Sequence, residues 1–182
     1  MEIEQIITTD AKYLLVGCEA IKERDGMSEL WHVMVKYYQI APIETFELPI
    51  RGLFLFAFSQ DLDEILQKLR TAIIDKKFKF KICKKFTPLE KTMKSNLNEM
   101  MTILPDYLKK IPSNAKWRII IHRRHSSIER QEIITSIASH PNAPKGKVDL
   151  DNAEWDIIVE IFGEWLGLGV FPSNSVVSIK NV

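Results

Sequence analysis

The 182-residue sequence lacks the features that mark several protein classes. It has only two cysteines, Cys18 and Cys83, which lie far apart and form no Cys-x-x-Cys pair. This spacing gives neither a disulfide framework nor a zinc site, and it is typical of the reducing cytoplasm. No apolar run approaches the ~20 residues that a membrane-spanning helix needs, and the acidic start, MEIEQ, is not a signal peptide. We therefore expect a cytoplasmic protein with no membrane partner.

Motifs of catalysis and nucleotide binding are missing as well. The sequence has no GxGxxG fingerprint and no P-loop. His125 precedes Ser126 and Ser127, but no nucleophile elbow or ordered acid accompanies them. His122 and His125 have His-x-x-His spacing, yet a metal site needs three or four ligands and none of the usual ones lies nearby in the sequence. We therefore expect no enzymatic activity, no cofactor and no metal ion.

The chain does have a strong segregation of charge. The formal net charge is only +1, and a hydrophobic content of 46% is sufficient for a packed core. Residues 76–147 hold 17 basic and 5 acidic residues, a net charge of +12, which leaves −11 for the rest of the chain. This asymmetry predicts an anionic partner for the middle of the chain. The alternative is a set of solvated helix faces and linkers.

The first half of the chain predicts six alternating elements. Helices are expected over residues 27–38 and 62–73, where apolar side chains share one face, and Asp61 with Glu64 forms a capping box for the second. Apolar runs and strict alternation predict strands at Lys12–Cys18, Ile43–Leu48, Leu53–Phe58 and Lys77–Cys83. The order strand, helix, strand, strand, helix, strand is that of a ferredoxin-like domain. We place its end at residue 84.

The second half predicts two helices and several strands. Thr87–Glu90 supplies an N-cap, a first-turn proline and a capping glutamate, so a helix is expected from there to Leu108, kinked or split at Pro105. A second helix follows Ser126, which can cap it together with Glu129. Strands are expected at Trp117–Ile121, Trp155–Phe162, Trp165–Phe171 and, at an edge, Val176–Ile179. Gly167 and Gly169 would admit another backbone or relieve crowding.

The most distinctive stretch is Trp117–Gln131, WRIIIHRRHSSIERQ. It begins as a strand, turns into a basic corner of His122, Arg123, Arg124 and His125, and leads into a helix. A guanidinium fork suits phosphate oxygens, and the free N–H groups of a helix N-terminus favour an anion. The stretch therefore predicts a phosphate-binding corner.

The order of motifs in the second half resembles the THUMP domain family. Arg123-Arg124 before a serine-initiated helix, KVDLDN at 147–152, IIVEIF at 157–162 and GLGV at 167–170 follow the family pattern. The chain departs from it at Ala153-Glu154, where the family commonly has proline before the acid. The resemblance implies an α+β protein: a ferredoxin-like domain at residues 1–84, then a THUMP domain at 85–182 with a mixed sheet and flanking helices.

THUMP proteins act on RNA, mostly tRNA, and usually carry a catalytic domain. The chain is most similar to the stand-alone type that serves cytidine N4-acetylation. The resemblance therefore implies a non-catalytic tRNA-binding adaptor that presents tRNA to a separate RNA cytidine acetyltransferase. Two alternatives remain: an RNA-modifying enzyme without recognisable motifs, and a regulatory or interaction module.

Seven basic residues are the candidate RNA contacts. The arginines belong to the stretch Trp117–Gln131, one pair of lysines lies in the loop at 140–147, and another lies at the expected domain junction. The alternative for the arginines is salt bridging to Glu129 or Glu132. The candidates are Arg123, Arg124, Arg130, Lys145, Lys147, Lys84 and Lys85.

Overall fold

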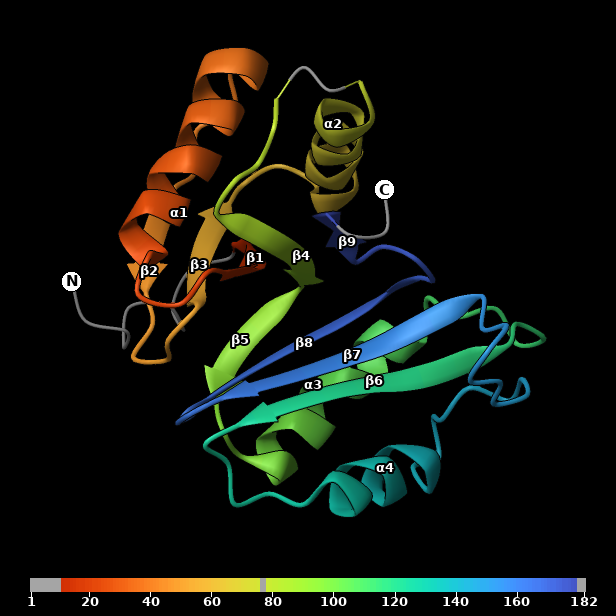
Figure 1. Ribbon diagram of the computed structural model, residues 1–182. Helices are drawn as coiled ribbons and strands as arrows, with labels where there is room; N and C mark the ends of the chain where they lie inside the picture. Colours follow the sequence, from red (N-terminus) through yellow and green to blue (C-terminus); the bar gives the residue numbers. More distant parts are fainter. Residues whose placement is uncertain (1–10, 76–77, 180–182) are drawn as a thin grey trace. The chain divides into compact units, whose positions relative to one another are not determined.

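The computed structural model describes residues 11–75 and 78–179 (Figure 1). It divides into two compact units: the first contains the described residues of Met1–Pro88 and Ser175–Val182, and the second is Leu89–Asn174. The domain limits expected from the sequence, 1–84 and 85–182, stay a prediction. Within the described residues, no helix is long and apolar enough to cross a membrane.

The first unit contains a five-stranded sheet in the order β2-β3-β1-β4-β9. β1 and β2 both pair antiparallel with β3, and β4 pairs antiparallel with β9. All six residues of β3 are buried, which explains its continuous apolar sequence, LFLFAF. The strands are β1 (Lys12–Cys18), β2 (Glu44–Glu47), β3 (Leu53–Phe58), β4 (Cys83–Leu89) and β9 (Val177–Ser178).

Two long helical segments accompany this sheet. The first is α1 (Glu23–Trp31), which runs on as a π-helix, η2 (His32–Tyr37). The second is α2 (Leu62–Ile74), whose expected N-cap, Asp61, accepts the backbone N–H of Asp63 at 2.8 Å. The other member of the expected capping box, Glu64, instead pairs with Lys68 at 2.5 Å. The helices and the strands at 12–18 and 53–58 are thus confirmed, and the capping box only in its first residue.

The strand expected at Lys77–Cys83 is wrong. Lys77 lies outside the described residues, residues 78–82 are not in a strand, and β4 begins only at Cys83. The Glu29 carboxylate from α1 accepts the backbone N–H groups of Lys81, at 2.6 Å, and Cys83, at 2.8 Å. A side chain therefore satisfies the donors that a neighbouring strand would otherwise take. The alternation of apolar and polar residues could not show that a side chain would take the place of a partner strand.

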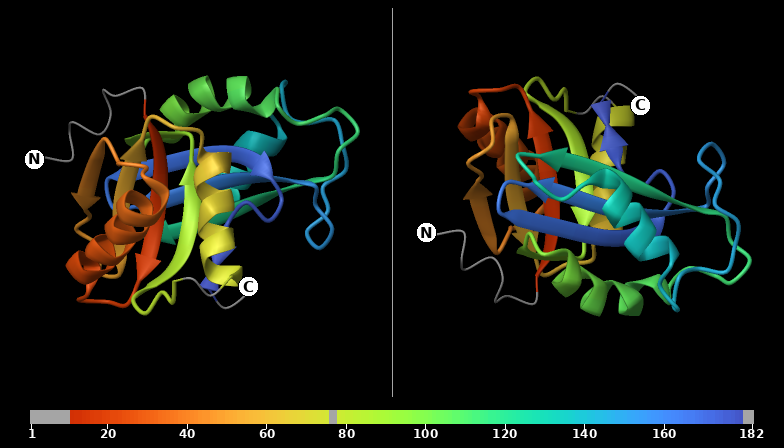
Figure 2. Two further views of the ribbon diagram at one scale, coloured as in Figure 1. Left: turned by 90° about the horizontal axis from the view of Figure 1, so that it is seen from above. Right: turned by 90° about the horizontal axis from the view of Figure 1, so that it is seen from below.

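The second unit contains a four-stranded mixed sheet in the order β5-β8-β7-β6. β6 is parallel to β7, whereas β7 and β5 are both antiparallel to β8. Both helices cover one face of this sheet (Figures 1 and 2), and their apolar side chains share a core with it. The elements are β5 (Lys91–Lys94), α3 (Leu97–Leu108), β6 (Trp117–Arg124), α4 (Arg130–Ala138), β7 (Trp155–Phe162) and β8 (Trp165–Pro172).

The expected start of the first helix in this half, at Pro88, is wrong by nine residues. Thr87 and Leu89 lie in β4, and α3 begins at Leu97, where Asn96 Oδ1 accepts the N–H of Glu99 at 3.2 Å. Glu90, only 4% exposed, accepts the N–H of Val170 at 3.1 Å and pairs with Lys110. The capping pattern at 87–90 was thus coincidental.

The expected cap of α4 is also wrong. The helix begins at Arg130 after Glu129, whose carboxylate accepts from Arg123 at 3.1 Å. Ser126 lies before the helix, and its hydroxyl accepts the N–H of Ile128 at 3.1 Å. Pro105 lies inside α3 and does not split it.

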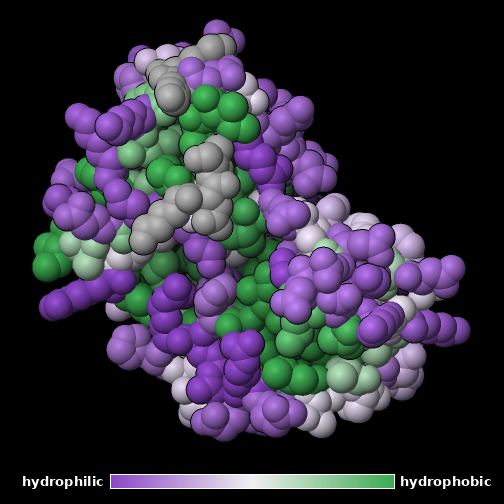
Figure 3. All heavy atoms as spheres, turned by 45° about the vertical axis from the view of Figure 1, so that its right-hand side comes forward, coloured by the Kyte–Doolittle hydropathy of each residue, from purple (hydrophilic) through white to green (hydrophobic). Residues whose placement is uncertain are grey.

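Several large hydrophobic side chains remain at the surface. Figure 3 shows hydrophobic groups exposed among hydrophilic ones on one face of the molecule. The exposed residues of the first unit are Ile21, Trp31, Tyr37, Ile43 and Ile74, and those of the second are Val148 and Leu150. Trp117 and Trp165, by contrast, are buried at 3% and 5% exposure.

Candidate nucleic-acid interface

Three strands of the second unit end at the same edge of its sheet. β6 is parallel to β7, and β5 and β7 are both antiparallel to β8, so β5, β6 and β7 all run in one direction. α3 follows β5 and α4 follows β6, so both helices begin at this edge. Helix N-termini carry partial positive charge and free N–H donors. The edge is therefore electrostatically suited to anions.

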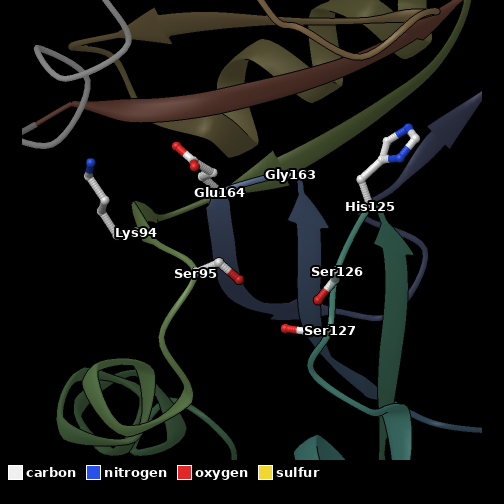
Figure 4. A pocket seen from close by; sticks show the side chains of 7 residues that line it. All are labelled: Lys94, Ser95, His125, Ser126, Ser127, Gly163 and Glu164. Atoms are coloured by element: carbon white, nitrogen blue, oxygen red, sulfur yellow. The ribbon is translucent and has the colours of Figure 1, made fainter.

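A pocket of about 620 Å³ opens at this edge (Figure 4). Figure 4 shows the hydroxyls of Ser95, Ser126 and Ser127 pointing into the space between the strand ends. A hydroxyl both donates and accepts hydrogen bonds, so this set can bind phosphate or ribose oxygens. The other lining residues are Lys94, His125, Gly163 and Glu164.

The pocket walls are held by backbone contacts between the strand ends. Gly163 N–H donates to Arg124 O at 2.9 Å, and Ser95 N–H donates to Glu164 O at 2.8 Å. His125 has a φ of 55°, in the left-handed region that non-glycine residues rarely adopt. This conformation turns the chain out of β6 and into the serine pair. Strained residues of this kind concentrate at functional sites.

A buried carboxylate supports the basic side chains of β6. Glu160 on β7 is only 1% exposed, with His122 Nδ1 at 2.8 Å and Arg124 Nη1 at 3.2 Å. The two basic partners are 38% and 35% exposed, so each reaches from the buried acid to solvent. A guanidinium carries five N–H donors, so Arg124 can bind Glu160 and a phosphate together. The arrangement fixes two basic groups at the strand end.

The same arrangement occurs earlier on these two strands. Arg118 Nε donates to Asp156 Oδ1 at 2.7 Å, and the Asp156 side chain is 2% exposed. Ser173 Oγ also donates to this carboxylate at 2.9 Å. Arg118, His122 and Arg124 are separated by even numbers of residues along β6, so their side chains lie on one face of the sheet. β6 thus presents a row of basic groups anchored on acids of β7.

The other two candidate arginines, Arg123 and Arg130, are engaged locally. Arg123 Nη1 donates to Ile128 O and to Glu129 Oε2, which ties the β6–α4 connection together. Arg130 Nη1 donates to Ile121 O at 3.1 Å. The alternative of a salt bridge to Glu129 thus applies to Arg123. Contact of either arginine with RNA stays a prediction.

The predicted lysines fall in two separate places. Lys145 and Lys147 are exposed on the α4–β7 loop, whose base is fixed because Trp117 N–H donates to Lys147 O at 3.1 Å. Lys84 and Lys85 lie on β4, in the first unit. The structure therefore groups the arginines at one strand end and places the lysine pairs elsewhere.

Sequence reasoning missed Lys94, Ser95 and the buried acids Asp156 and Glu160. The first two were assigned to a helix, and the acids sit in strands with otherwise apolar sequences. One available signal was the acidic residue inside IIVEIF, which a buried strand tolerates only with a partner. Within the part of the chain that the structure describes, no three His, Cys, Asp or Glu side chains form a group that could hold a metal.

Comparisons with known proteins identify one domain in the chain. Residues 94–170 match the model of the THUMP domain, so the chain contains a THUMP domain there. The matched stretch runs from Lys94 through the basic corner to β8. A comparison with curated proteins found no match.

Three solved structures share the fold over most of this chain. PH1313 from Pyrococcus horikoshii Ot3 is 13% identical with a TM-score of 0.65, over 92% of this chain and 55% of its own. TrmN from Thermus thermophilus is 12% identical with a TM-score of 0.54, over 87% and 45%. A 4-thiouridine synthetase, solved as an RNA complex with bound ATP, is 14% identical with a TM-score of 0.53, over 92% and 42%. The chain spans about half the length of these structures.

One expectation is overturned by these matches. The sequence predicted a protein with no enzymatic activity, but the fold recurs in a synthetase that was solved with RNA and ATP. This chain covers only 42% of that synthetase, so catalytic motifs can lie in the part of such a protein that has no counterpart here. The absence of catalytic motifs therefore does not exclude an enzyme.

Proposed function

We propose that this chain binds tRNA at the strand-end edge of its THUMP domain and serves a tRNA-modification reaction. The observation that carries the proposal is the Glu160-anchored pair, His122 and Arg124, beside a pocket lined with hydroxyls. A fixed cation loses less conformational freedom on binding a phosphate than a free side chain does. This preorganisation distinguishes the edge from an ordinary basic surface.

The RNA is recognised mainly by its phosphates and shape. The major groove of an A-form helix is too deep and narrow for side chains, so duplex sequence is poorly accessible. Arg124, Lys145 and Lys147 contact phosphates in this proposal, and Arg123 and Arg130 do so with the donors that their local bonds leave. Lys84 and Lys85 provide further contacts from the first unit, which we take to be ferredoxin-like.

A finer form of the proposal names the reaction. The resemblance to stand-alone THUMP proteins supports delivery of tRNA to an RNA cytidine acetyltransferase in the cytoplasm. A synthetase among the matched structures supports a second form, in which the chain is the RNA-binding part of a modification enzyme. Native purification followed by identification of bound RNA and proteins separates the two. Recovery of an acetyltransferase supports the first, and formation of a modified nucleoside by the purified protein with tRNA and candidate donors supports the second.

Charge reversal in the pocket tests tRNA binding. Lys94→Glu places a negative charge at the edge and should weaken binding of a fluorescent tRNA at least tenfold at low salt. Lys109→Glu is the matched control, because Lys109 is 70% exposed and follows the last residue of α3, about 18 Å from its N-terminus. Equal binding by wild type and Lys94→Glu, or no tRNA binding by the wild type, contradicts the proposal.

A further inference from the structure

The π-helical turn of the first unit creates an unusual aromatic surface. His32 and Tyr37 are five residues apart, and in an α-helix they would point about 140° away from each other. In η2 the wider turn brings their rings to a centroid distance of 5.7 Å, nearly perpendicular at 72°. π-turns are rare and often mark functional sites. The π-helical turn therefore brings two aromatic side chains together on one face of the helix.

A third ring joins this pair from a distant part of the sequence. Phe78 follows α2, and its ring lies 6.3 Å from His32 and 6.0 Å from Tyr37. Figures 1 and 2 show residues 78–82, which lead into β4, passing beside α1 and η2. Phe78 also contacts Phe80 at 5.0 Å, which contacts the fully buried Phe86 at 5.2 Å. The surface rings are thus anchored in the core.

These rings stay open to solvent in basic surroundings. Tyr37 is 55% exposed, His32 is exposed and Phe78 is half-buried. Lys36 precedes Tyr37 and Lys79 follows Phe78, and both are exposed. Residues 76–88 contain six lysines and no acid. An anchored aromatic surface beside lysines combines the two features that bind single-stranded nucleic acid: a stacking platform and positive charge.

We propose that His32, Tyr37 and Phe78 form a stacking platform for an unpaired RNA base, with Lys36 and Lys79 binding the flanking phosphates. This site is distinct from the strand-end edge of the THUMP domain. It rests on the proposed function only in taking RNA as the ligand. The exposed ring of Tyr37 supplies stacking area, since this residue is 55% exposed. Stacking is independent of base identity, so the platform recognises single-strandedness.

Binding of the full chain to labelled decauridine RNA and to a ten-base-pair RNA duplex tests the platform. Tyr37→Ala should weaken decauridine binding on the order of tenfold, whereas Tyr37→Phe keeps the ring and should bind as wild type. Duplex binding should not change in either variant. Trp31→Ala is the matched control, since Trp31 is another exposed aromatic of the same helix, at 43% exposure.

Photocrosslinking gives a second readout that a merely structural role would not produce. Decauridine containing 5-iodouridine should crosslink to a peptide that contains His32, Tyr37 or Phe78. Unchanged decauridine binding by Tyr37→Ala, an equal loss in Trp31→Ala, or crosslinks only elsewhere overturns the platform. If the wild type binds tRNA but not decauridine, the platform fails alone. If it binds decauridine but not tRNA or duplex, the proposed function fails and the platform stands.

Discussion

Arg124 donates a hydrogen bond to Glu160 across two parallel strands, at 3.2 Å, and the acid is only 1% exposed. A buried carboxylate is costly unless it is paired, so the acid in the core strand β7 depends on the basic residues of β6. Because those residues are about one-third exposed, the same contact orients a cation toward solvent. Stability and anion binding are therefore linked at this position.

A double-mutant cycle measures this link. Arg124→Ala and Glu160→Gln should each lower the free energy of unfolding by about 1–3 kcal/mol, since the first removes a donor from the buried carboxylate and the second removes the charge that strengthens the hydrogen bond. The double variant should lose less than the sum, with a coupling of at least about 0.5 kcal/mol. Urea denaturation followed by circular dichroism gives the three values. Strict additivity would show that the contact contributes nothing.

The two lysines of the α4–β7 loop should contribute to the salt dependence of RNA binding. Lys145 and Lys147 are exposed, and their replacement by alanine removes two potential phosphate contacts. The slope of log affinity for tRNA against log salt should fall by about 1.4–1.8, because each contact contributes ~0.7–0.9. Binding titrations at salt concentrations from about 50 to about 200 mM measure this slope. An unchanged slope would remove these lysines from the interface.

The elements with one dominant local signal were predicted well from the sequence. Lys12–Cys18, Leu53–Phe58 and Trp155–Phe162 have the predicted bounds, because buried strands are rich in apolar residues. The failures arose where a distant side chain decided the outcome. Glu29 replaced a strand partner at 81–83, and Glu90 became a buried acid although its sequence context matched a helix start.

The candidate site was predictable only in part for the same reason. The basic corner was visible in the sequence, but its acidic anchor lies 36 residues away from Arg124. Only the parallel register of β6 and β7, which places His122 beside Glu160, reveals which basic residue is anchored. Lys94 lines the pocket because it ends the strand β5, in a segment where the sequence predicted a helix. Long-range pairing therefore determined the residues that the sequence could not identify.

Crowding at Gly167 predicts a destabilising substitution with a specific suppressor. A Cβ at this position would lie 2.4 Å from Leu89 Cδ1, and Leu89 is fully buried. Gly167→Ala should therefore lower the free energy of unfolding by about 1–3 kcal/mol through overpacking. Leu89→Ala alone costs about 2–5 kcal/mol, but in the Gly167→Ala background it should cost clearly less, because the new methyl group gains room. Thermal unfolding of the four proteins tests this, and equal costs in both backgrounds would contradict the steric cause.

The two described cysteines are free thiols that should react slowly in the folded protein. Burial, reinforced by the carboxylate of Glu23, raises the pKa of Cys18 to about 11. Burial also raises the pKa of Cys83 far above its usual range, and its Sγ lies 3.3 Å from the Gly26 carbonyl oxygen as an S–H donor would.

A raised pKa lowers the thiolate fraction at a given pH, by about a hundredfold for a thiol whose pKa is about 11, as at Cys18. Thiolates of higher pKa are intrinsically more nucleophilic, which recovers part of this loss and leaves alkylation about tenfold slower than in the unfolded chain. Iodoacetamide labelling at pH ~8, followed by mass spectrometry, should show this for Cys18 and a stronger protection for Cys83. The rate at Cys18 should continue to rise up to pH 11. Labelling in urea is the control, since unfolding restores both pKa values, and equal native and unfolded rates would exclude the burial that raises them.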